Sequence, residues 1–450
     1  MTKQKIERRH DAPMCNDILK LLKIKDENIQ VMTVEEYVEV RGQLSTVVYG
    51  TLSYKPESCM KCGCVNDGQI HKHGKRVSRL TLLKSQESNV YLNLAKERFK
   101  CLHCSKTFTA QTSIVDSHCF ITNRVKLAIQ HRLTRVQSEL DIANDCSVSP
   151  STVKRCLHKL SQSLTVRPSS GLPRHISIDE FKSVKNVTTA ISFLFVNNET
   201  NQIIDILEDR RIHKLKEYFY RFDRRERLAV RTVTADMYEP YINFVHEVFP
   251  NAILIFDRFH IVQHLNRELN KQRISVMNAY RYKSSTDYTK LKKHWRLFLS
   301  DRQDINSYEY FWSKSFKTYT TSRDILGYLL NLDQQLYDTY MLVHQLREAL
   351  KQCDWLRFKE ILQDVEKKQV SRGVWRVIRF YKKYEYVLYA TIQHPMFNNG
   401  AIEGINNKIK LIKRVSYGYR NFNNFKARIL IIFKLYQRRK KHGLLINDVA

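Results

Sequence analysis

The sequence is poor in acidic residues and contains no long apolar run. Its 450 residues carry 76 Lys and Arg against 45 Asp and Glu, a formal net charge of +31. Its apolar stretches are short, such as "ILIIF" at 429–433, whereas a membrane-spanning helix needs roughly 18 residues. The N-terminus, "MTKQKIERRHDAP", lacks the apolar segment of a secretory signal. These absences argue against a membrane or exported protein and predict a cytoplasmic one.

The excess of positive charge predicts a polyanionic partner. A chain of pI ≈ 9.7 repels itself unless a polyanion binds, so nucleic acid is the first candidate and an anionic membrane surface the second. No amphipathic anchor supports the membrane alternative. Hydrophobic residues make up 43% and aromatic residues 11% of the chain, which is enough to fill real cores. We therefore expect a folded, multidomain, nucleic-acid-binding protein.

Changes in composition and in the expected secondary structure divide the chain into segments. The stretch "RPSSGLPRH" at 167–175 is rich in Pro, Ser and Gly and reads as a linker. Short β-rich runs follow it, first as a meander and then alternating with helices, which indicates a mixed sheet covered by helices. The expected segments are an N-terminal segment 1–50, a cysteine-rich domain 51–115, a helical domain 120–166, the linker 167–175, the first part of the sheet domain 176–260, a Gly- and Pro-poor helical insertion 261–395, and a basic C-terminal region 396–450.

Two cysteine pairs predict a structural zinc site. "CMKC" supplies Cys59 and Cys62, and "CLHC" supplies Cys101 and Cys104, with 38 residues between the pairs. Two such turns present four thiolates, the tetrahedral set that Zn²⁺ prefers. No ligand position remains open for water, so the zinc would be structural. Four unrelated buried cysteines are the alternative.

A helix-turn-helix candidate follows at 138–160. Apolar or small residues at Leu140, Ile142, Ala143, Cys146, Val148, Val153, Cys156 and Leu157 fit two short helices across a tight turn. Ser149 is expected to cap the second helix, with Pro150 at its first position. The residues expected to face DNA are Ser151, Thr152, Lys154, Arg155 and Lys159. A helical hairpin without a DNA role is the alternative.

Two apolar strands end in aspartate, at Asp179 in "ISID" and Asp236 in "VTAD". A carboxylate there costs desolvation unless a cation or hydrogen bonds receive it. Adjacent strands lie about 4.8 Å apart, so the two aspartates could share a divalent metal of the kind used in phosphoryl transfer. Taken singly, each could instead be a helix cap or turn residue.

The segment 398–422 contains one acid, Glu403, among asparagines and lysines. As a helix it places Ile402, Ile405, Ile409 and Ile412 on one apolar stripe. Glu403 then falls on another face, together with Asn407, Lys410 and Arg414. We expect that face to meet DNA phosphate and metal.

The motifs resemble the bacterial insertion-sequence transposases of the ISL3 family. The resemblance covers nearly the whole chain, and it is carried by "SIDEF" (177–181), "ADMYEPY" (235–241), "PNAILIFDRFHIVQHLN" (250–266) and "IEGINNKIKLIKRVSYGYRNFNNFKARIL" (402–430). It implies an α+β and α/β multidomain fold. An N-terminal zinc ribbon and helix-turn-helix would precede a ribonuclease H-like mixed five-stranded sheet, which a large all-helical insertion interrupts. Met60 departs from the expected proline in the first knuckle.

The same resemblance implies the site residues. The catalytic triad would be Asp179, Asp236 and Glu403, binding Mg²⁺ or Mn²⁺. Asp257 and His260 in "DRFH" resemble a C/D-x-x-H element and would support the active site, although Asp257 also ends a strand and rivals the others as a metal ligand. The residues expected along the DNA backbone are Lys410, Lys413, Arg414 and Arg420, with the tail "QRRKKH" at 437–442; a solvated basic face is the alternative.

The resemblance implies a Mg²⁺-dependent DDE transposase. It would bind the terminal inverted repeats of an insertion sequence, cleave the DNA ends and transfer them to target DNA. Pairing two ends predicts a homodimer or larger assembly, associated with the bacterial nucleoid and not with a membrane. The alternatives are a non-catalytic, transposase-derived DNA-binding regulator and a ribonuclease H-like nuclease.

Overall fold

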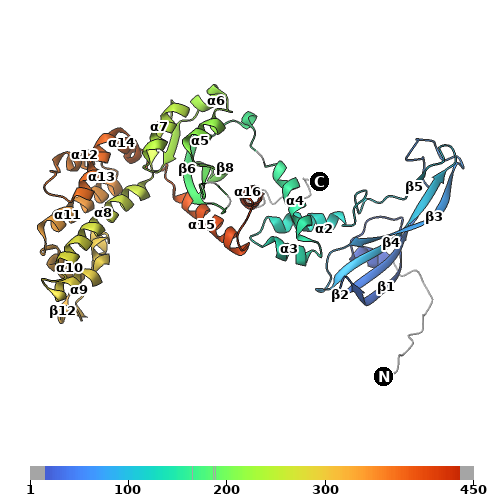
Figure 1. Cartoon of the computed structure of the whole chain (residues 1–450), viewed down its shortest axis with the longest axis horizontal. Coiled ribbons are helices and arrows are strands. Elements are labelled where there is room, and N and C mark those ends of the chain that lie inside the picture. Colours follow the sequence, from blue (N-terminus) through green and yellow to red (C-terminus); the bar gives the residue numbers. More distant parts are fainter. Residues whose placement is uncertain (1–15, 165, 186, 188, 436–450) are drawn as a thin grey trace, which may run out of the picture. The chain divides into compact units, whose positions relative to one another are not determined.

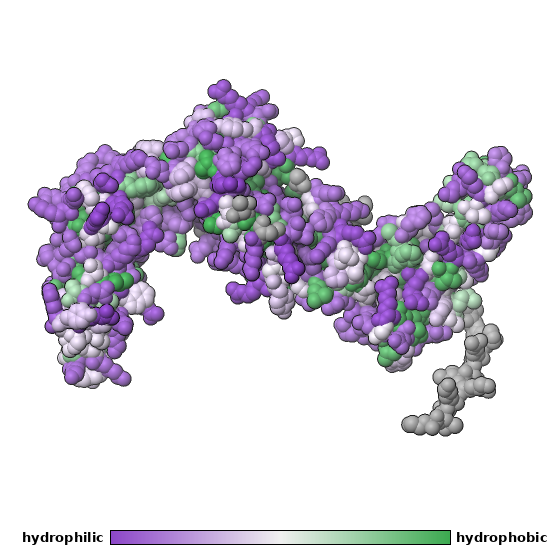
Figure 2. Space-filling model, in the orientation of Figure 1, coloured by the Kyte–Doolittle hydropathy of each residue, from purple (hydrophilic) through white to green (hydrophobic). Residues whose placement is uncertain are grey.

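The computed structural model describes residues 16–164, 166–185, 187 and 189–435 (Figure 1). The chain folds into two compact units, one made of residues 1–165 and 410–450 and the other of residues 166–409. The division at 165/166 lies next to the linker expected at 167–175. Hydrophilic residues cover most of the visible face (Figure 2). In the part of the chain that the structure describes, no helix combines the length and apolar character needed to cross a bilayer.

A mixed five-stranded sheet forms the first part of the first unit. Its strands are β1 (Ile29–Val40), β2 (Gln43–Leu52), β3 (Ile70–Thr81), β4 (Asn89–Cys101) and β5 (Thr107–Thr109). The order is β1-β2-β4-β3, with β5 beside β4. Only β2 and β4 pair in parallel; the other neighbours are antiparallel. A short helix, α1 (Asn16–Leu21), packs on β1 and the apolar core beneath it.

The hairpin between β1 and β2 turns at two residues with positive φ, Arg41 (55°) and Gly42 (77°). Two successive positive φ angles give a turn whose twist matches that of the flanking strands. Residue 50, the expected end of the N-terminal segment, lies inside β2. The strands before it therefore share one sheet and one core with the cysteine-bearing β4, because their apolar residues have no other surface to cover.

Helices complete the first unit. They are α2 (Asn123–Leu133), α3 (Glu139–Asp145), α4 (Pro150–Gln162) and α16 (Phe422–Leu430), followed by a π-helical turn at Ile431–Leu435. All four helices share one apolar core, to which α16 contributes Ala427 and the following turn Ile431. Arg428 is fully buried and donates to the carbonyl oxygens of Leu133, Arg135 and Gln137. The first unit thus joins segments almost 300 residues apart.

A second mixed five-stranded sheet forms the start of the second unit. This confirms the prediction of a mixed five-stranded sheet in this part of the chain. Its strands are β6 (His175–Lys182), β7 (Ile191–Asn197), β8 (Gln202–Leu207), β9 (Thr232–Ala235) and β10 (Ile253–Phe256), in the order β10-β9-β6-β7-β8. β6, β7 and β8 form an antiparallel meander, whereas β6, β9 and β10 are parallel. The helices that follow β8 and β9 are α5 (Ile212–Phe219), α6 (Arg224–Leu228) and α7 (Glu239–Val248).

A long, mostly helical segment follows β10. Its helices are α8 (Arg258–Ala279), α9 (Ser285–Lys293), α10 (Ser322–Leu330), α11 (Gln334–Gln352), α12 (Trp355–Asp364), α13 (Arg372–Lys383) and α14 (Glu385–Gln393). The expectation of an all-helical insertion is corrected by a small sheet, β11 (Phe311–Ser313) and β12 (Thr318–Thr320). Aromatic and β-branched residues favour strands, and here Trp312 packs against Tyr319 with ring centroids 5.4 Å apart.

The helical insertion is anchored on the edge of the second sheet. The buried Thr391 of α14 accepts a hydrogen bond from the backbone N–H of Phe256 in β10, at 2.9 Å. Side chains of the sheet and the insertion belong to one continuous apolar core. The chain then forms α15 (Gly400–Val415), which carries Glu403. The insertion therefore occupies the edge of the sheet and leaves the ends of its parallel strands accessible to α15.

Candidate active site and cysteine cluster

Three aspartates lie at equal distances along the chain from one row of in-register residues in the second sheet. In the parallel pairs, His175 of β6 and Ile253 of β10 are both in register with Thr232 of β9. Counting four residues onward from each member of that row reaches Asp179, Asp236 and Asp257. Since neighbouring strands lie about 4.8 Å apart, the register alone brings the three carboxylates to one edge of the sheet.

Asp179 is held by two hydrogen bonds and lies next to a second carboxylate. Its Oδ1 accepts the backbone N–H of Glu180 at 2.7 Å, and its Oδ2 accepts the side-chain amide of Asn406 at 2.7 Å. Burial and the neighbouring Asp236 carboxylate raise the pKa of Asp179 to about 7. Burial and a second negative charge both disfavour ionisation, so a cation at this point would be strongly stabilised.

His260 lies between the other two carboxylates. Its Nδ1 is 2.9 Å from Oδ2 of Asp257 and 2.9 Å from Oδ1 of Asp236. The two contacts raise the pKa of His260 to about 10. A single N–H can be directed at only one acceptor, and the well-directed hydrogen bond of His260 Nδ1 is to Asp257. Asp257 also accepts from the backbone N–H of Phe259 and so caps α8. His260 is therefore held at the strand ends by the cap of the helix that carries it.

Helix α15 packs its amino-terminal part against β6. Asn399 donates its side-chain amide to the carbonyl oxygen of Ile178, and Asn406 donates to Asp179. Glu403 lies four residues after the first and three before the second, so the three share one face of the helix. The Glu403 side chain is exposed and, among the described residues, accepts no hydrogen bond and forms no ion pair.

The apolar stripe predicted for this helix is confirmed. Ile402, Ile405, Ile409 and Ile412 are all buried, whereas Glu403, Asn407, Lys410 and Arg414 are exposed. Asn406, on the boundary between these faces, was not anticipated. Its contact with Asp179 joins residues 227 positions apart in the sequence. The asparagine pairs at 398–399 and 406–407 were the sequence signal from which this contact could have been predicted.

A second unanticipated contact supports the site from behind. Glu180, the residue after Asp179, accepts the hydroxyl of Tyr241 and, at 2.6 Å, the guanidinium of Arg210. Tyr241 is buried on α7, five residues after Asp236. This network ties β6 to the segment that follows β9. The motifs "SIDEF" and "ADMYEPY" thus touch each other, and Glu180 fixes the strand end that carries Asp179.

The carboxylate cluster fits a divalent cation. Ligand atoms of Asp236, Asp257 and His260 all lie within 4.8 Å of one another. Oδ1 of Asp236 is buried, and no described residue donates a well-directed hydrogen bond to it. A buried carboxylate oxygen without a donor is costly, and oxygen ligands are those that Mg²⁺ prefers. The residues brought together are therefore Asp179, Asp236, Asp257 and His260, with Glu403 on the adjoining helix face.

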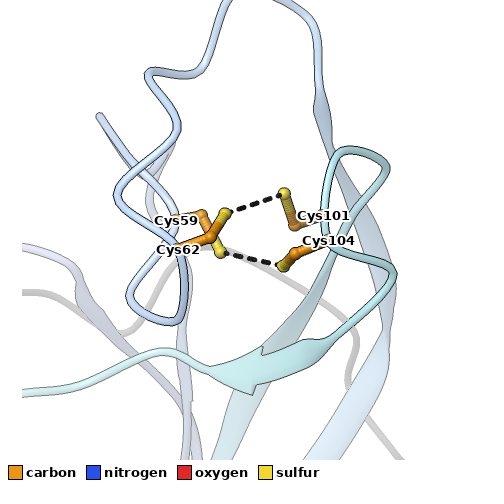
Figure 3. Close-up of side chains that lie close together, drawn as sticks. All are labelled: Cys59, Cys62, Cys101 and Cys104. Carbon is orange, nitrogen blue, oxygen red and sulfur yellow. Dashed lines mark hydrogen bonds between the residues drawn. The ribbon is translucent and has the colours of Figure 1, made fainter.

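The four predicted cysteines come together in the first unit (Figure 3). Cys59 and Cys62 lie in the loop before β3, Cys101 ends β4, and Cys104 lies in the turn before β5. Sγ of Cys59 is 3.7 Å from Sγ of Cys104, and Sγ of Cys62 is 3.9 Å from Sγ of Cys101. The pairs therefore face each other across one small volume.

These distances fit a tetrahedral metal site. Four sulfurs at a Zn–S distance of about 2.3 Å lie about 3.8 Å apart. Although burial opposes it, hydrogen bonds from the backbone of Lys61 and Cys62 lower the pKa of Cys59 to about 7. Such bonds favour the thiolate that binds metal. Cys64 lies next to the cluster, but its thiol donates to the carbonyl of Val65.

Two short helices, α3 and α4, form within the segment 138–160, and the exposed face of α4 differs from the expectation at one residue. Ser149 caps α4 by accepting from the backbone N–H of Thr152, and Pro150 takes the first position. Thr152 is buried, however, and does not face outward. Its hydroxyl accepts from Arg155 at 3.0 Å, because this position borders the buried stripe of Val153, Leu157 and Leu160. The remaining expected positions, Ser151, Lys154, Arg155 and Lys159, are exposed.

Leu140 is a second correction, because the expected core residue is 58% exposed on α3. Ile142, Ala143 and Cys146 form the buried side of that helix and its turn instead. Of the basic residues expected near the C-terminus, Lys410, Arg414 and Arg420 are exposed and Lys413 is half-buried. The tail at 437–442 lies outside the described residues.

Comparison with known proteins matches more than half of the chain to transposases. The family model of ISL3-type DDE transposases, described as "Transposase", matches residues 176–429. The transposase for insertion sequence element IS1001 of Bordetella parapertussis is 24% identical over 386 residues, covering 83% of this chain and 88% of that protein. An ATP-dependent protease of Lactococcus lactis subsp. lactis is 33% identical over 111 residues, covering 25% of this chain and 35% of that protein.

Proposed function

Because the chain belongs to the ISL3 family of DDE transposases, we propose that it cleaves the DNA ends of an insertion sequence and joins them to target DNA. The observation that carries this proposal is the row of aspartates, Asp179, Asp236 and Asp257, beneath the helix face that bears Glu403. The sheet order β8-β7-β6-β9-β10, an antiparallel meander followed by two parallel strands, supports a ribonuclease H-like catalytic domain. The short match to a protease carries no argument for activity.

Asp179, Asp236 and Glu403 are the residues proposed to hold Mg²⁺ or Mn²⁺. Bound there, the ions supply activation of the attacking oxygen and stabilisation of the leaving oxygen. Asp179 has its carboxylate oriented by Asn406 and Glu180, and Asp236 offers a buried oxygen that lies 2.9 Å from His260 Nδ1 without a well-directed hydrogen bond. The contacts with Asp236 and Asp257 raise the pKa of His260, which favours the imidazolium that would offset the repulsion between the two carboxylates. We assign Asp257 and His260 to active-site support.

Two reactions share this site in the proposal. Water attacks the phosphodiester at an element end, the bond to the 3′ oxygen breaks, and a free 3′-hydroxyl remains. That hydroxyl then attacks a target phosphodiester, forming one bond as another breaks. Water and the 3′-hydroxyl are the attacking groups in the two steps, so no covalent bond to the protein is required.

DNA recognition is assigned to the first unit. The exposed face of α4, with Ser151, Lys154, Arg155 and Lys159, is proposed to enter the major groove of the terminal inverted repeats. The cysteine cluster would hold structural Zn²⁺ and fix the loops beside β3 and β4. Lys410, Lys413, Arg414 and Arg420 would contact the DNA backbone. Two ends must be paired, so the active assembly is proposed to be a dimer or larger.

The proposal is tested with purified protein, Mg²⁺ and duplex DNA that carries the element ends. Asp179→Ala, Asp236→Ala and Glu403→Gln should each lower end cleavage and strand transfer by about a thousandfold or more, with end binding intact. Glu360→Gln removes an exposed carboxylate of α12 and serves as the matched control. Full joining by the Glu403 variant would exclude it from the triad. Binding without cleavage by the wild type would favour the regulator, and cleavage without joining the nuclease.

A further inference from the structure

The two edges of the first sheet carry opposite charges. The edge strand β1 exposes Glu35, Glu36 and Glu39 and contains no Lys, Arg or His. The opposite edge strand, β3, contains no Asp or Glu. Its basic residues, all exposed, are His71, Lys72, His73, Lys75, Arg76 and Arg79. The sheet therefore has one acidic edge and one basic edge.

The cations of β3 are crowded rather than paired. Arg76 lies directly opposite Lys96 of β4, and like charges in that position are destabilising. Burial and Arg76 together lower the pKa of Lys96. Lys72 does form an ion pair, with the buried Glu97 at 3.7 Å. A bound polyanion would relieve the remaining repulsion, which a solvated edge does not.

The basic edge continues into a groove at the start of α4. A cavity of about 670 Å³ is lined by β3 and β4 on one side and by the turn before α4 on the other. Arg41 and Arg79 lie in its wall, and Ser149, the cap of α4, lies at its end. The hydroxyl of Ser147 donates to the side chain of Asn89 at 2.5 Å and holds this turn against the sheet.

The groove has the character of an anion site. The first turn of the 13-residue helix α4 presents backbone N–H groups and the positive end of the helix dipole, both of which favour phosphate. The two arginines add charge to the same cavity. A charged edge strand can also serve simply to prevent pairing with another sheet. That role needs no particular sign and no groove, whereas here the basic edge leads into a groove at the start of α4.

We propose that β3 and this groove bind the sugar-phosphate backbone of duplex DNA beside the major-groove segment that receives α4. The inference rests on the proposed function, since it names a further surface for the same DNA. Backbone contacts fix register and orientation without reading sequence. The surface should therefore add affinity for any duplex, while the exposed side chains of α4 discriminate between sequences.

The test is a salt titration of DNA binding with the full-length Asp179→Ala protein. Fluorescence anisotropy gives Kd for a duplex with the element end and for a random duplex at several salt concentrations. The combined variant Lys75→Gln, Arg76→Gln and Arg79→Gln should reduce the slope of log K against log salt by about 2 to 3. At physiological salt the affinity should fall roughly ten- to hundredfold. Both duplexes should be affected equally.

A matched variant removes three exposed lysines from the second unit, Lys283→Gln, Lys314→Gln and Lys367→Gln. Its salt slope should equal that of the parent protein, and zinc content and Tm should be unchanged in both variants. An unchanged slope in the β3 variant, an equal loss in the control, or a loss confined to the element end would each overturn the inference. If the parent protein itself does not distinguish the element end from random DNA, the proposed function fails instead.

Discussion

The molecule contains two mixed five-stranded sheets that place their charged residues differently. The first sheet carries charge along its edges. The basic edge strand, β3, has 12 residues and spans about 40 Å. The second sheet gathers carboxylates along one row of the parallel strands β6, β9 and β10, within β6 at Asp179 and directly after β9 and β10. A charged edge matches an extended polymer, whereas converging carboxylates match a single small cation. The arrangement of strands thus separates a surface suited to holding DNA from a site suited to reacting with it.

Strand direction accounts for the difference. In the second sheet, β9 and β10 end directly before Asp236 and Asp257, whereas β6 carries Asp179 on the same row and, contrary to the expectation that its strand ends there, continues to Lys182. Parallel strands in register thus bring one residue type together as a cluster. In the first sheet, β2 and β4 are parallel and the other neighbours antiparallel, and the segment after β2 and the end of β4 bring Cys59 and Cys101 together. That convergence uses thiolates in tight turns. The comparison predicts that variants of the two sheets affect different measurements.

The largest effect expected from comparing the two sheets is on DNA binding, and it separates binding from catalysis. Cys101→Ser removes a ligand of the cysteine cluster, and structural zinc supplies folding free energy to its surroundings. We expect loss of zinc and a fall in affinity for element ends of about a hundredfold or more, measured by metal analysis and anisotropy. The second unit should keep its fold, because its core does not involve the cluster.

Cys353→Ser is the matched control, because this half-buried thiol lies in the helical insertion and outside the cluster. It should keep both zinc and end binding. Full zinc content in the Cys101 variant would contradict the assignment of the ligands. If both variants kept their zinc but lost affinity for element ends, DNA recognition would lie outside the cysteine cluster.

A smaller effect is expected where distant segments of the first unit meet. Arg428 is fully buried and satisfies three carbonyl oxygens beyond and at the end of α2. Arg428→Met leaves these oxygens without a donor and should lower the free energy of unfolding by about 3 kcal/mol. Thermal or urea unfolding measures it. Arg124→Met, at an exposed position on α2, should change stability little; equal losses would show that hydrogen bonding to α2 is not the cause.

The sequence predicted features that depend on local pattern. An aspartate next to apolar strand residues interrupts their pattern, so Asp179 and Asp236 could be picked out from the sequence, although β6 continues past Asp179 to Lys182. The isoleucine spacing of α15 and the C-x-x-C turns are likewise local signals. Sheet order then brought these elements together as expected.

Contacts between distant segments were not predictable in this way. Asn406 reaches Asp179 only because α15 returns to β6 after the insertion, and an asparagine in a helix is common without such a role. Thr152 was misplaced because a residue at the border of a buried stripe is assigned to either face by a small rotation. The strands β11 and β12 were missed because three residues are too few to show alternation.

The smallest expected effect concerns the support behind the second sheet. Tyr241→Phe removes the hydroxyl that Glu180 accepts, leaving Arg210 as its remaining partner in this network. Residues behind a site typically change activity by about ten- to a hundredfold. Since Arg210 remains, we expect about a tenfold fall in the cleavage rate and a higher Mg²⁺ concentration for half-maximal activity, with DNA affinity unchanged. Tyr238→Phe alters a neighbouring, 49% exposed tyrosine and should keep the parent rate and Mg²⁺ dependence. A Tyr241 variant that lost DNA affinity as well would break the separation between the two sheets, since a contact within the second sheet would then control the surface assigned to the first.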